Sequence, residues 1–168
     1  MIAISLVDGL QPATRDAGRH FRKIFRRCYF YLVDDFRSEN PTEIIKSLAK
    51  KLTELMGDDY PEISERIDNV CEIIEQEACL VNEVIRKSRK KMQRLASELK
   101  KDQVSTVNGK HALSLFVGHI GSKSFLNRLA SEEGLTIDWN DFEKYFAEHK
   151  EKSAAGMEKS KAQKTNRS

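Results

Sequence analysis

The sequence predicts an all-α fold, a helical bundle with one long charged helix or a kinked helix pair. Only eight glycines and three prolines interrupt the 168 residues, and they fall between segments in which apolar residues recur every three or four positions. Hydrophobic residues make up 39 % of the chain and charged residues 33 %, which favours a polar, soluble, helix-rich protein. Residues 62–101 contain neither glycine nor proline, which predicts that this segment forms the long helix or the kinked helix pair.

The first long helix is expected from about Asp16 to about Phe36. An apolar N-terminal segment and a turn that contains Gly9 and Pro12 precede it. Its predicted buried stripe recurs at helical spacing and consists of Phe21, Ile24, Phe25, Cys28, Tyr29 and Leu32. The other side is basic, with six cations beside the single acid Asp16: Arg15, Arg19, Arg22, Lys23, Arg26 and Arg27.

Two further helices are expected before residue 102. One begins at Pro41 and ends at Gly57, a residue type that commonly follows a helix C-terminus in a left-handed conformation. The other covers residues 62–101, and its first half is acidic whereas its second half is basic, an order that complements the helix dipole. The basic half forms a second basic patch that includes Arg86, Lys90 and Arg94.

The C-terminal part is expected to hold two more helices. Residues 103–110 are predicted to form a polar connector with a turn at Asn108-Gly109, and residues 117–121 a loop. Ser122 is the expected N-cap of a helix that ends at Gly134, and Asp138 that of the last helix. The polar tail, residues 154–168, is expected to be a frayed helical extension or disordered, so the predicted domain covers residues 1–153.

The composition and motifs disfavour several classes of function. No span approaches the roughly 18 apolar residues of a membrane helix. Three cysteines without a C-x-x-C pair argue against a disulfide framework and a zinc module, and favour a reducing compartment. The four histidines are scattered, and no phosphate-binding loop or nucleophile motif occurs. We therefore predict no catalytic and no metal-binding residue in this chain.

The basic side of the first helix is the strongest functional feature. Arginine outnumbers lysine there by five to one, and its planar guanidinium can donate two parallel hydrogen bonds to a phosphate. An A-form RNA duplex suits such a face, because it is recognised largely through phosphates and ribose hydroxyls. A merely solvated helix face is the simpler alternative. Membrane binding is less favoured, because the opposite face is needed for the core.

Several short motifs occur in order: Asp8-Gly9, Pro12 and Gly18; Arg22-Lys23-Ile24-Phe25-Arg26-Arg27; Gly57-Asp58-Asp59-Tyr60-Pro61-Glu62-Ile63; Ile74-Glu75-Gln76-Glu77-Ala78; and Glu132-Glu133-Gly134-Leu135-Thr136-Ile137-Asp138 with Phe142-Glu143. Their order and spacing resemble the helical tRNA-recognition region that follows the catalytic domain of alanyl-tRNA synthetases. The resemblance covers residues 1 to about 155. It implies an all-α region that binds the acceptor stem of a tRNA.

Two positions depart from the family pattern. The family's Asn and Asp, which recognise the G:U wobble pair of the acceptor stem, correspond to Thr14 and Val117 here. Thr14 can still offer one hydroxyl hydrogen bond, whereas Val117 has no polar side-chain atom. Standard wobble-pair recognition is therefore not expected. Mitochondrial members of the family depart from the pattern in this segment as well. The resemblance therefore favours an intracellular location, in the mitochondrion more than in the cytoplasm.

The resemblance also implies which part of aminoacylation this chain serves. ATP and Mg²⁺ are expected only in the family's catalytic domain, whose motifs do not occur in this chain, so the chain alone should not aminoacylate. We expect tRNA to contact Thr14 and the six cations of the first helix, with Arg86, Lys90 and Arg94 as a secondary surface. Three interpretations are open: part of a ligase, a separate gene product, or a non-catalytic module whose residues 62–101 pair with a protein partner.

Overall fold

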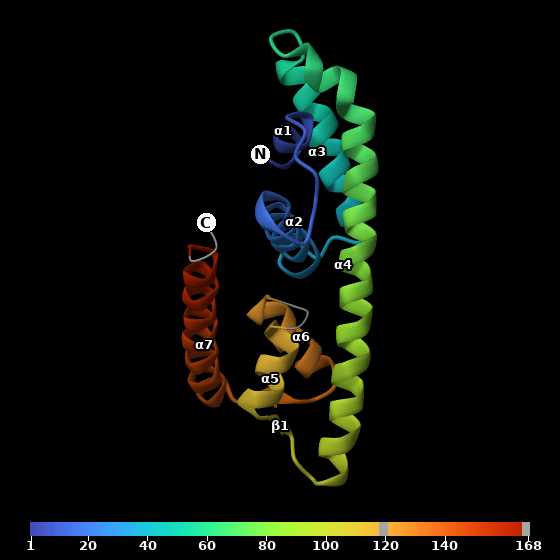
Figure 1. Ribbon diagram of the computed structural model, residues 1–168. Coiled ribbons are helices and arrows are strands. Elements are labelled where there is room, and N and C mark those ends of the chain that lie inside the picture. Colours follow the sequence, from blue (N-terminus) through green and yellow to red (C-terminus); the bar gives the residue numbers. More distant parts are fainter. Residues whose placement is uncertain (118–120, 166–168) are drawn as a thin grey trace. The chain divides into compact units, whose positions relative to one another are not determined.

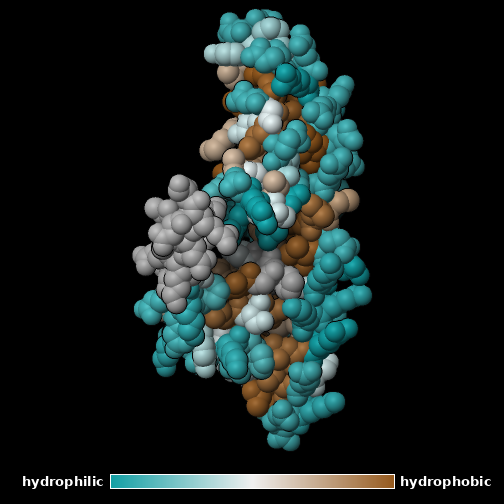
Figure 2. Space-filling model, viewed as in Figure 1, coloured by the Kyte–Doolittle hydropathy of each residue, from teal (hydrophilic) through white to brown (hydrophobic). Residues whose placement is uncertain are grey.

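The chain forms seven helices and one very short parallel sheet in a computed structural model that describes residues 1–117 and 121–165 (Figure 1). The predicted all-α class is confirmed, because the helices dominate and each strand has only two residues. The face shown in Figure 2 is largely hydrophilic, with apolar patches between the polar side chains. Within the described ranges, no helix has both the length and the apolar character needed to cross a bilayer.

The chain divides into two compact units, an N-terminal unit of residues 1–87 and a C-terminal unit of residues 88–168. This differs from the single domain predicted for residues 1–153. The boundary lies within α4 (Pro61–Lys101), one continuous helix of 41 residues. At 1.5 Å per residue this helix is about 60 Å long, which exceeds the diameter of a single small core. Each half of α4 therefore contributes to a separate core.

The N-terminal unit contains α1 (Ile2–Val7), α2 (Asp16–Asp34), α3 (Pro41–Met56) and the first part of α4. Its core holds three stacked or tilted rings from successive turns of α2, Phe21, Phe25 and Tyr29, with centroids 6.1 Å apart. Ile45 of α3 and Ile74 of α4 are also buried. The expected helices at about 16–36 and 41–57 are thus confirmed to within two residues, and the apolar N-terminal segment forms α1.

One detail of the predicted first long helix is wrong. Ile24 is 45 % exposed, whereas Phe30, absent from the predicted stripe, is 3 % exposed. Helical spacing alone included Ile24 in the buried stripe and omitted Phe30. The elements that pack against a helix determine where its buried face ends. The predicted helix end at Gly57 is confirmed: Gly57 is the C-cap of α3, with a right-handed φ of −65°. Its small size matters instead, because an added Cβ would lie 2.7 Å from Ser64 Oγ.

The C-terminal unit contains the rest of α4, β1 (Thr106–Val107), α5 (Gly109–Leu115), α6 (Lys123–Glu132), β2 (Thr136–Ile137) and α7 (Trp139–Thr165). Strands β1 and β2 pair in parallel, with Thr106 opposite Thr136 and Val107 opposite Ile137. The sequence did not predict this sheet, because two-residue strands carry no alternation pattern. The predicted turn at Asn108-Gly109 is also wrong: Asn108 is the N-cap of α5 and Gly109 its first residue.

The predicted helix ends in this unit are confirmed. The Ser122 side chain accepts a hydrogen bond from the Phe125 N–H, and Gly134 follows α6 with φ at +71°. Asp138 Oδ1 accepts from the Asp141 N–H at 2.9 Å and caps α7. The α7 backbone continues to Thr165, so residues 154–165 of the predicted tail are helical. Residues 118–120 of the predicted loop, including His119, and residues 166–168 lie outside the described residues.

Candidate nucleic-acid interface

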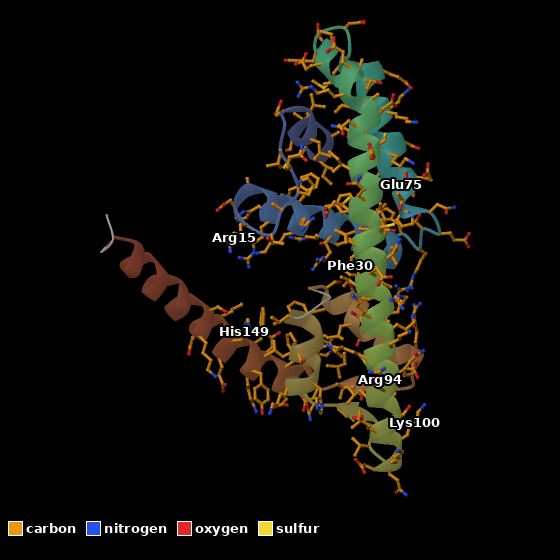
Figure 3. All side chains as sticks on the ribbon, turned by 45° about the vertical axis from the view of Figure 1, so that its right-hand side comes forward. Arg15, Phe30, Glu75, Arg94, Lys100 and His149 are labelled. Carbon is orange, nitrogen blue, oxygen red and sulfur yellow. The ribbon has the colours of Figure 1, made fainter. Side chains whose placement is uncertain are left out.

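Three cations of α2 and the residue before it are exposed, and we name these four residues the basic face: Arg15, Arg19, Lys23 and Arg27. Arg19, Lys23 and Arg27 are spaced four residues apart within the helix, so they lie along one side of it, and Arg15 is the N-cap at its start. Figure 3 shows Arg15 at the N-terminal end of α2. Among the described residues, no hydrogen bond or ion pair engages the side chains of Arg15, Arg19 or Lys23. These groups are therefore available to an external anion.

The core contacts of α2 determine which side of the helix is exposed. The Tyr29 hydroxyl donates to Asn82 Oδ1 of α4 at 3.0 Å and lies 3.3 Å from Thr42 Oγ1 of α3. Near the start of α2, a Cβ on Gly18 would lie 2.4 Å from the Gln11 carbonyl oxygen. The segment before the helix therefore packs directly against the α2 backbone, which explains the glycine at this position.

Arg22 does not belong to the exposed row, which corrects the prediction that six cations share one surface. Its Nε lies 2.9 and 3.0 Å from the two carboxylate oxygens of Glu77, and its Nη2 lies 2.8 Å from Glu77 Oε1. The side chain of Glu77 is only 8 % exposed and that of Arg22 30 %. Arg22 follows the buried Phe21, so it emerges at the edge of the buried face and turns inward to α4.

Sequence reasoning did not identify Glu77 as the partner of Arg22. It lies on α4 between the buried residues Ile74 and Val81, three positions after the first and four before the second. This spacing places a carboxylate on an apolar helix face. Because a buried carboxylate normally requires a charged or hydrogen-bonding partner, that placement was a signal for an internal cation. It could not identify Arg22, which lies 55 positions away.

The two remaining arginines of α2 differ in their surroundings. Arg27 donates to the Tyr31 hydroxyl from Nε at 3.3 Å and from Nη2 at 3.1 Å, and its Cζ lies 5.6 Å from the centroid of the Tyr31 ring. This contact joins two exposed side chains and orients the Arg27 guanidinium on the surface. Arg26 is half-buried and is not part of the basic face.

The predicted secondary surface is divided between the two units. Arg86, in the N-terminal unit, donates to both carboxylate oxygens of Glu83, at 3.1 and 2.8 Å, and these hydrogen bonds raise its pKa. Lys90 and Arg94 are exposed in the C-terminal unit, and Figure 3 shows Arg94 on the second half of α4. No ion pair of Lys90 or Arg94 occurs among the described residues.

The two positions that replace the family's base-pair readers are both exposed. Thr14 lies immediately before α2 in the N-terminal unit, next to Arg15 of the basic face. Val117 follows α5 in the C-terminal unit and is 46 % exposed. Neither is needed for a core, so both side chains are free to contact a ligand, but only Thr14 can form a hydrogen bond to it.

Residue types that bind metals or perform covalent chemistry do not converge in the described parts of the chain. Within them, no group of three or more His, Cys, Asp or Glu side chains could hold a metal ion. The three cysteines are free thiols: Cys28 is half-buried, Cys71 buried and Cys79 exposed. Burial raises the pKa of the Cys28 thiol, which favours its unreactive protonated form.

Comparison with known proteins places this geometry in a family context. The full chain, residues 1–168, matches the family described as tRNA synthetases class II (A). It is 26 % identical to an alanine–tRNA ligase of Nitratidesulfovibrio vulgaris over 159 residues, which cover 92 % of this chain and 17 % of that protein. The ligase of Cytophaga hutchinsonii is 26 % identical over 161 residues, which cover 95 % and 18 %. The ligase of Chlorobium phaeovibrioides is 28 % identical over 151 residues, which cover 89 % and 16 %. The chain therefore spans less than a fifth of the length of these relatives.

Proposed function

This chain belongs to the class II (A) tRNA synthetase family, and we propose that it is the tRNA-binding portion of an alanine–tRNA ligase, whose basic face contacts the acceptor stem. The observation that carries the proposal is the exposed row of cations on α2, in a chain similar to alanine–tRNA ligases along most of its length. The proposal assigns RNA binding to this chain and no chemical step. ATP and Mg²⁺ would act in the catalytic domain of such a ligase.

The geometry of the basic face suits a duplex phosphate backbone. Residues four apart on a helix are about 6 Å apart along its axis, so the three helical cations from Arg19 to Arg27 extend about 12 Å, and Arg15 continues the face beyond the helix start. Each cation that meets a phosphate releases condensed counterions, which supplies sequence-independent affinity. Arginines at three of the four positions can each grip a phosphate with two parallel hydrogen bonds. Thr14, beside Arg15, is proposed to add one hydroxyl contact.

Recognition of the stem would therefore rest on backbone shape and charge more than on base reading. Val117 cannot accept a hydrogen bond from a base, so we do not propose the family's wobble-pair contact for this chain. Lys90 and Arg94 are proposed as secondary phosphate contacts, whereas Arg86 is engaged by Glu83. The departures at positions 14 and 117 also support our proposal of a mitochondrial setting, as in family members that relax this segment.

The test is a titration of the complete 168-residue chain into a fluorescent acceptor-stem hairpin at two salt concentrations. We expect Arg19→Ala and Lys23→Ala each to weaken binding, because each removes one phosphate contact. The slope of log affinity against log salt should flatten by roughly 0.7 to 0.9 for each lost contact. Binding that is insensitive to salt in the wild type would contradict the proposal.

The matched control is Lys50→Ala, which removes an exposed lysine from α3 of the same unit. It lowers the net charge by one, as Lys23→Ala does, but lies outside the basic face. We expect Lys50→Ala to leave both the affinity and the salt slope close to wild type. Equal losses in the two lysine variants would mean that only total charge matters and that the basic face has no special role.

The second candidate function is a non-catalytic module that binds a protein partner. It is favoured by large apolar side chains that are unusually exposed: Leu48 is 65 % exposed and Leu55 72 % exposed on α3, and Leu80 is 49 % exposed on α4. A purified chain that forms a concentration-dependent helical oligomer and does not bind the hairpin would favour this alternative. Hairpin binding by a monomer would favour the tRNA-binding proposal.

A further inference from the structure

We propose that Arg22 and Glu77 are a positioning pair, which orients α2 so that the basic face meets RNA while Arg22 itself makes no phosphate contact. The inference rests on the proposed function, because it assigns two residues a role in the same RNA-binding surface. It also replaces the role that the sequence predicted for Arg22, which was direct contact with RNA.

Two of the three guanidinium nitrogens of Arg22, Nε and Nη2, are engaged by Glu77. Its Nε and Nη2 donate to both oxygens of Glu77 at 2.8 to 3.0 Å, a bidentate arrangement. Such a fork determines direction as well as distance, whereas a single point contact determines distance only. Since Glu77 is 8 % exposed, transferring Arg22 to a phosphate would leave a buried carboxylate without its cation. Arg22 is therefore held by α4.

Polar links of α2 to α4 restrict the rotation of α2 about its axis. The ion pair joins position 22 to position 77, and the Tyr29 hydroxyl joins position 29 to Asn82, so the two links are two helical turns apart on α2. The apolar contacts of Phe21 and Phe25 are non-directional and tolerate small rotations. Directional contacts at two levels of the helix therefore set the angle at which its outer side chains project.

The direction in which the basic face points depends on the rotation of α2 about its axis. Arg19 lies three residues before Arg22 and Lys23 one residue after it, on the same helix. A rotation that broke the Arg22–Glu77 fork would turn both cations relative to the rest of the unit. Well-packed apolar residues can stabilise a fold as well as a buried ion pair does, so stability alone does not account for a charged pair here. The role of the pair in orienting the cations of the basic face accounts for its presence.

The first test is Arg22→Lys in the complete chain, measured by hairpin titration and by thermal melting. Lysine keeps the charge and its attraction to Glu77 but loses the fork. We expect a folded protein that binds the hairpin about tenfold more weakly well below its melting temperature. Unchanged hairpin affinity would overturn the inference, because a direct lysine–phosphate contact and a merely structural pair both predict that result.

The matched control is Arg86→Lys, which also removes an arginine fork from a carboxylate. Arg86 and Glu83 lie on the same helix three residues apart and are both exposed, so their ion pair is local to α4 and does not itself join two helices. We expect hairpin affinity within about twofold of wild type. A loss as large as that of Arg22→Lys would overturn the inference, since forks in general, and not the link between α2 and α4, would then matter.

The second test exchanges the partners in the double variant Arg22→Glu with Glu77→Arg. The exchange preserves net charge and an ion pair between α2 and α4, but takes the cation from position 22. We expect hairpin affinity to recover to within about threefold of wild type, well above that of Arg22→Glu alone, with an unchanged salt slope. A folded double variant whose slope is flatter by the equivalent of one phosphate contact would show that Arg22 binds RNA directly.

The outcomes separate the two proposals. A wild-type chain that does not bind the hairpin overturns the proposed function, and with it the role assigned to this pair. A wild-type chain that binds, together with an Arg22→Lys variant that binds equally well, overturns only the positioning role. If the exchanged pair does not fold, Glu77→Gln decides the question: it keeps the Arg22 cation but removes the carboxylate that holds it, so a positioning role predicts weaker hairpin binding, whereas direct contact by Arg22 predicts binding at least as tight as wild type.

Discussion

The two units of this chain begin their helices in different ways. In the N-terminal unit, the N-caps of α1, α2 and α3 are Met1, Arg15 and Asn40, and their side chains make no capping hydrogen bond. In the C-terminal unit, Asn108, Ser122 and Asp138 each accept a hydrogen bond from a backbone N–H at the start of α5, α6 and α7. Side-chain capping hydrogen bonds therefore mark these three helix starts in the C-terminal unit and none of the starts of α1, α2 and α3.

The N-terminal unit also has polar contacts between its helices. Arg22 pairs with Glu77, Lys46 of α3 with Glu75 of α4, and Arg66 of α4 donates to the Val7 carbonyl at the end of α1 at 2.6 Å. These partners lie 29 to 59 positions apart in the sequence. The unit that presents the basic face is thus held by contacts that form only in the folded state, which links the orientation of its cations to tertiary structure.

The largest expected effect comes from truncating one buried phenylalanine in the core of each unit. Phe25 and Phe142 are both fully buried, so Phe25→Ala and Phe142→Ala should each destabilise their own unit by about 3 to 5 kcal/mol. Trp139, the sole tryptophan, lies in the C-terminal unit. We expect Phe142→Ala to shift the thermal transition of Trp139 fluorescence strongly, and Phe25→Ala to shift mainly the loss of helical circular dichroism.

This pair of variants also tests whether the division into units has energetic meaning. If Phe25→Ala lowers the Trp139 transition as much as Phe142→Ala does, the two units unfold together and the contrast between them is only geometric.

A smaller effect is expected at two glycines of the C-terminal unit. A Cβ on Gly109 would lie 2.2 Å from the Asp141 carbonyl carbon and 2.3 Å from the Phe142 nitrogen, so α5 approaches the α7 backbone too closely for a side chain. Gly109→Ala should cost about 3 kcal/mol, because neither backbone can move freely. Gly134→Ala meets nothing within 4 Å but requires φ at +71°, and should cost about 1 kcal/mol. Denaturant titration distinguishes the two, and equal costs would contradict the close approach of α5 and α7.

The smallest effect compares two asparagines at N-cap positions. Asn108 Oδ1 accepts from the His111 N–H at 2.9 Å, so Asn108→Ala should cost about 1 kcal/mol. Asn40 makes no side-chain capping bond before α3, so Asn40→Ala should change stability by less than about 0.5 kcal/mol. Chemical denaturation of the two variants measures the difference. A larger loss in Asn40→Ala would remove the distinction between local and tertiary control of helix starts.

Part of the candidate site followed from the sequence and part did not. The row of cations on α2 was predictable, because four-residue spacing on a helix places side chains on one side whatever surrounds them. The exclusion of Arg22 was not predictable, because it depends on Glu77 arriving from another helix. The length of α4 followed from the absence of glycine and proline, whereas the boundary between the two units within it did not.

The amino-acid sequence by itself determined the helical class, most helix ends and the capping residues Ser122 and Asp138, because these depend on interactions within a few residues of chain. The tertiary structure alone decided the pairing of β1 with β2, the burial of Phe30 in place of Ile24, and the division of α2 cations into an outward row and an inward anchor. Contacts between distant segments carry no local pattern, and they form only when packing brings their partners together.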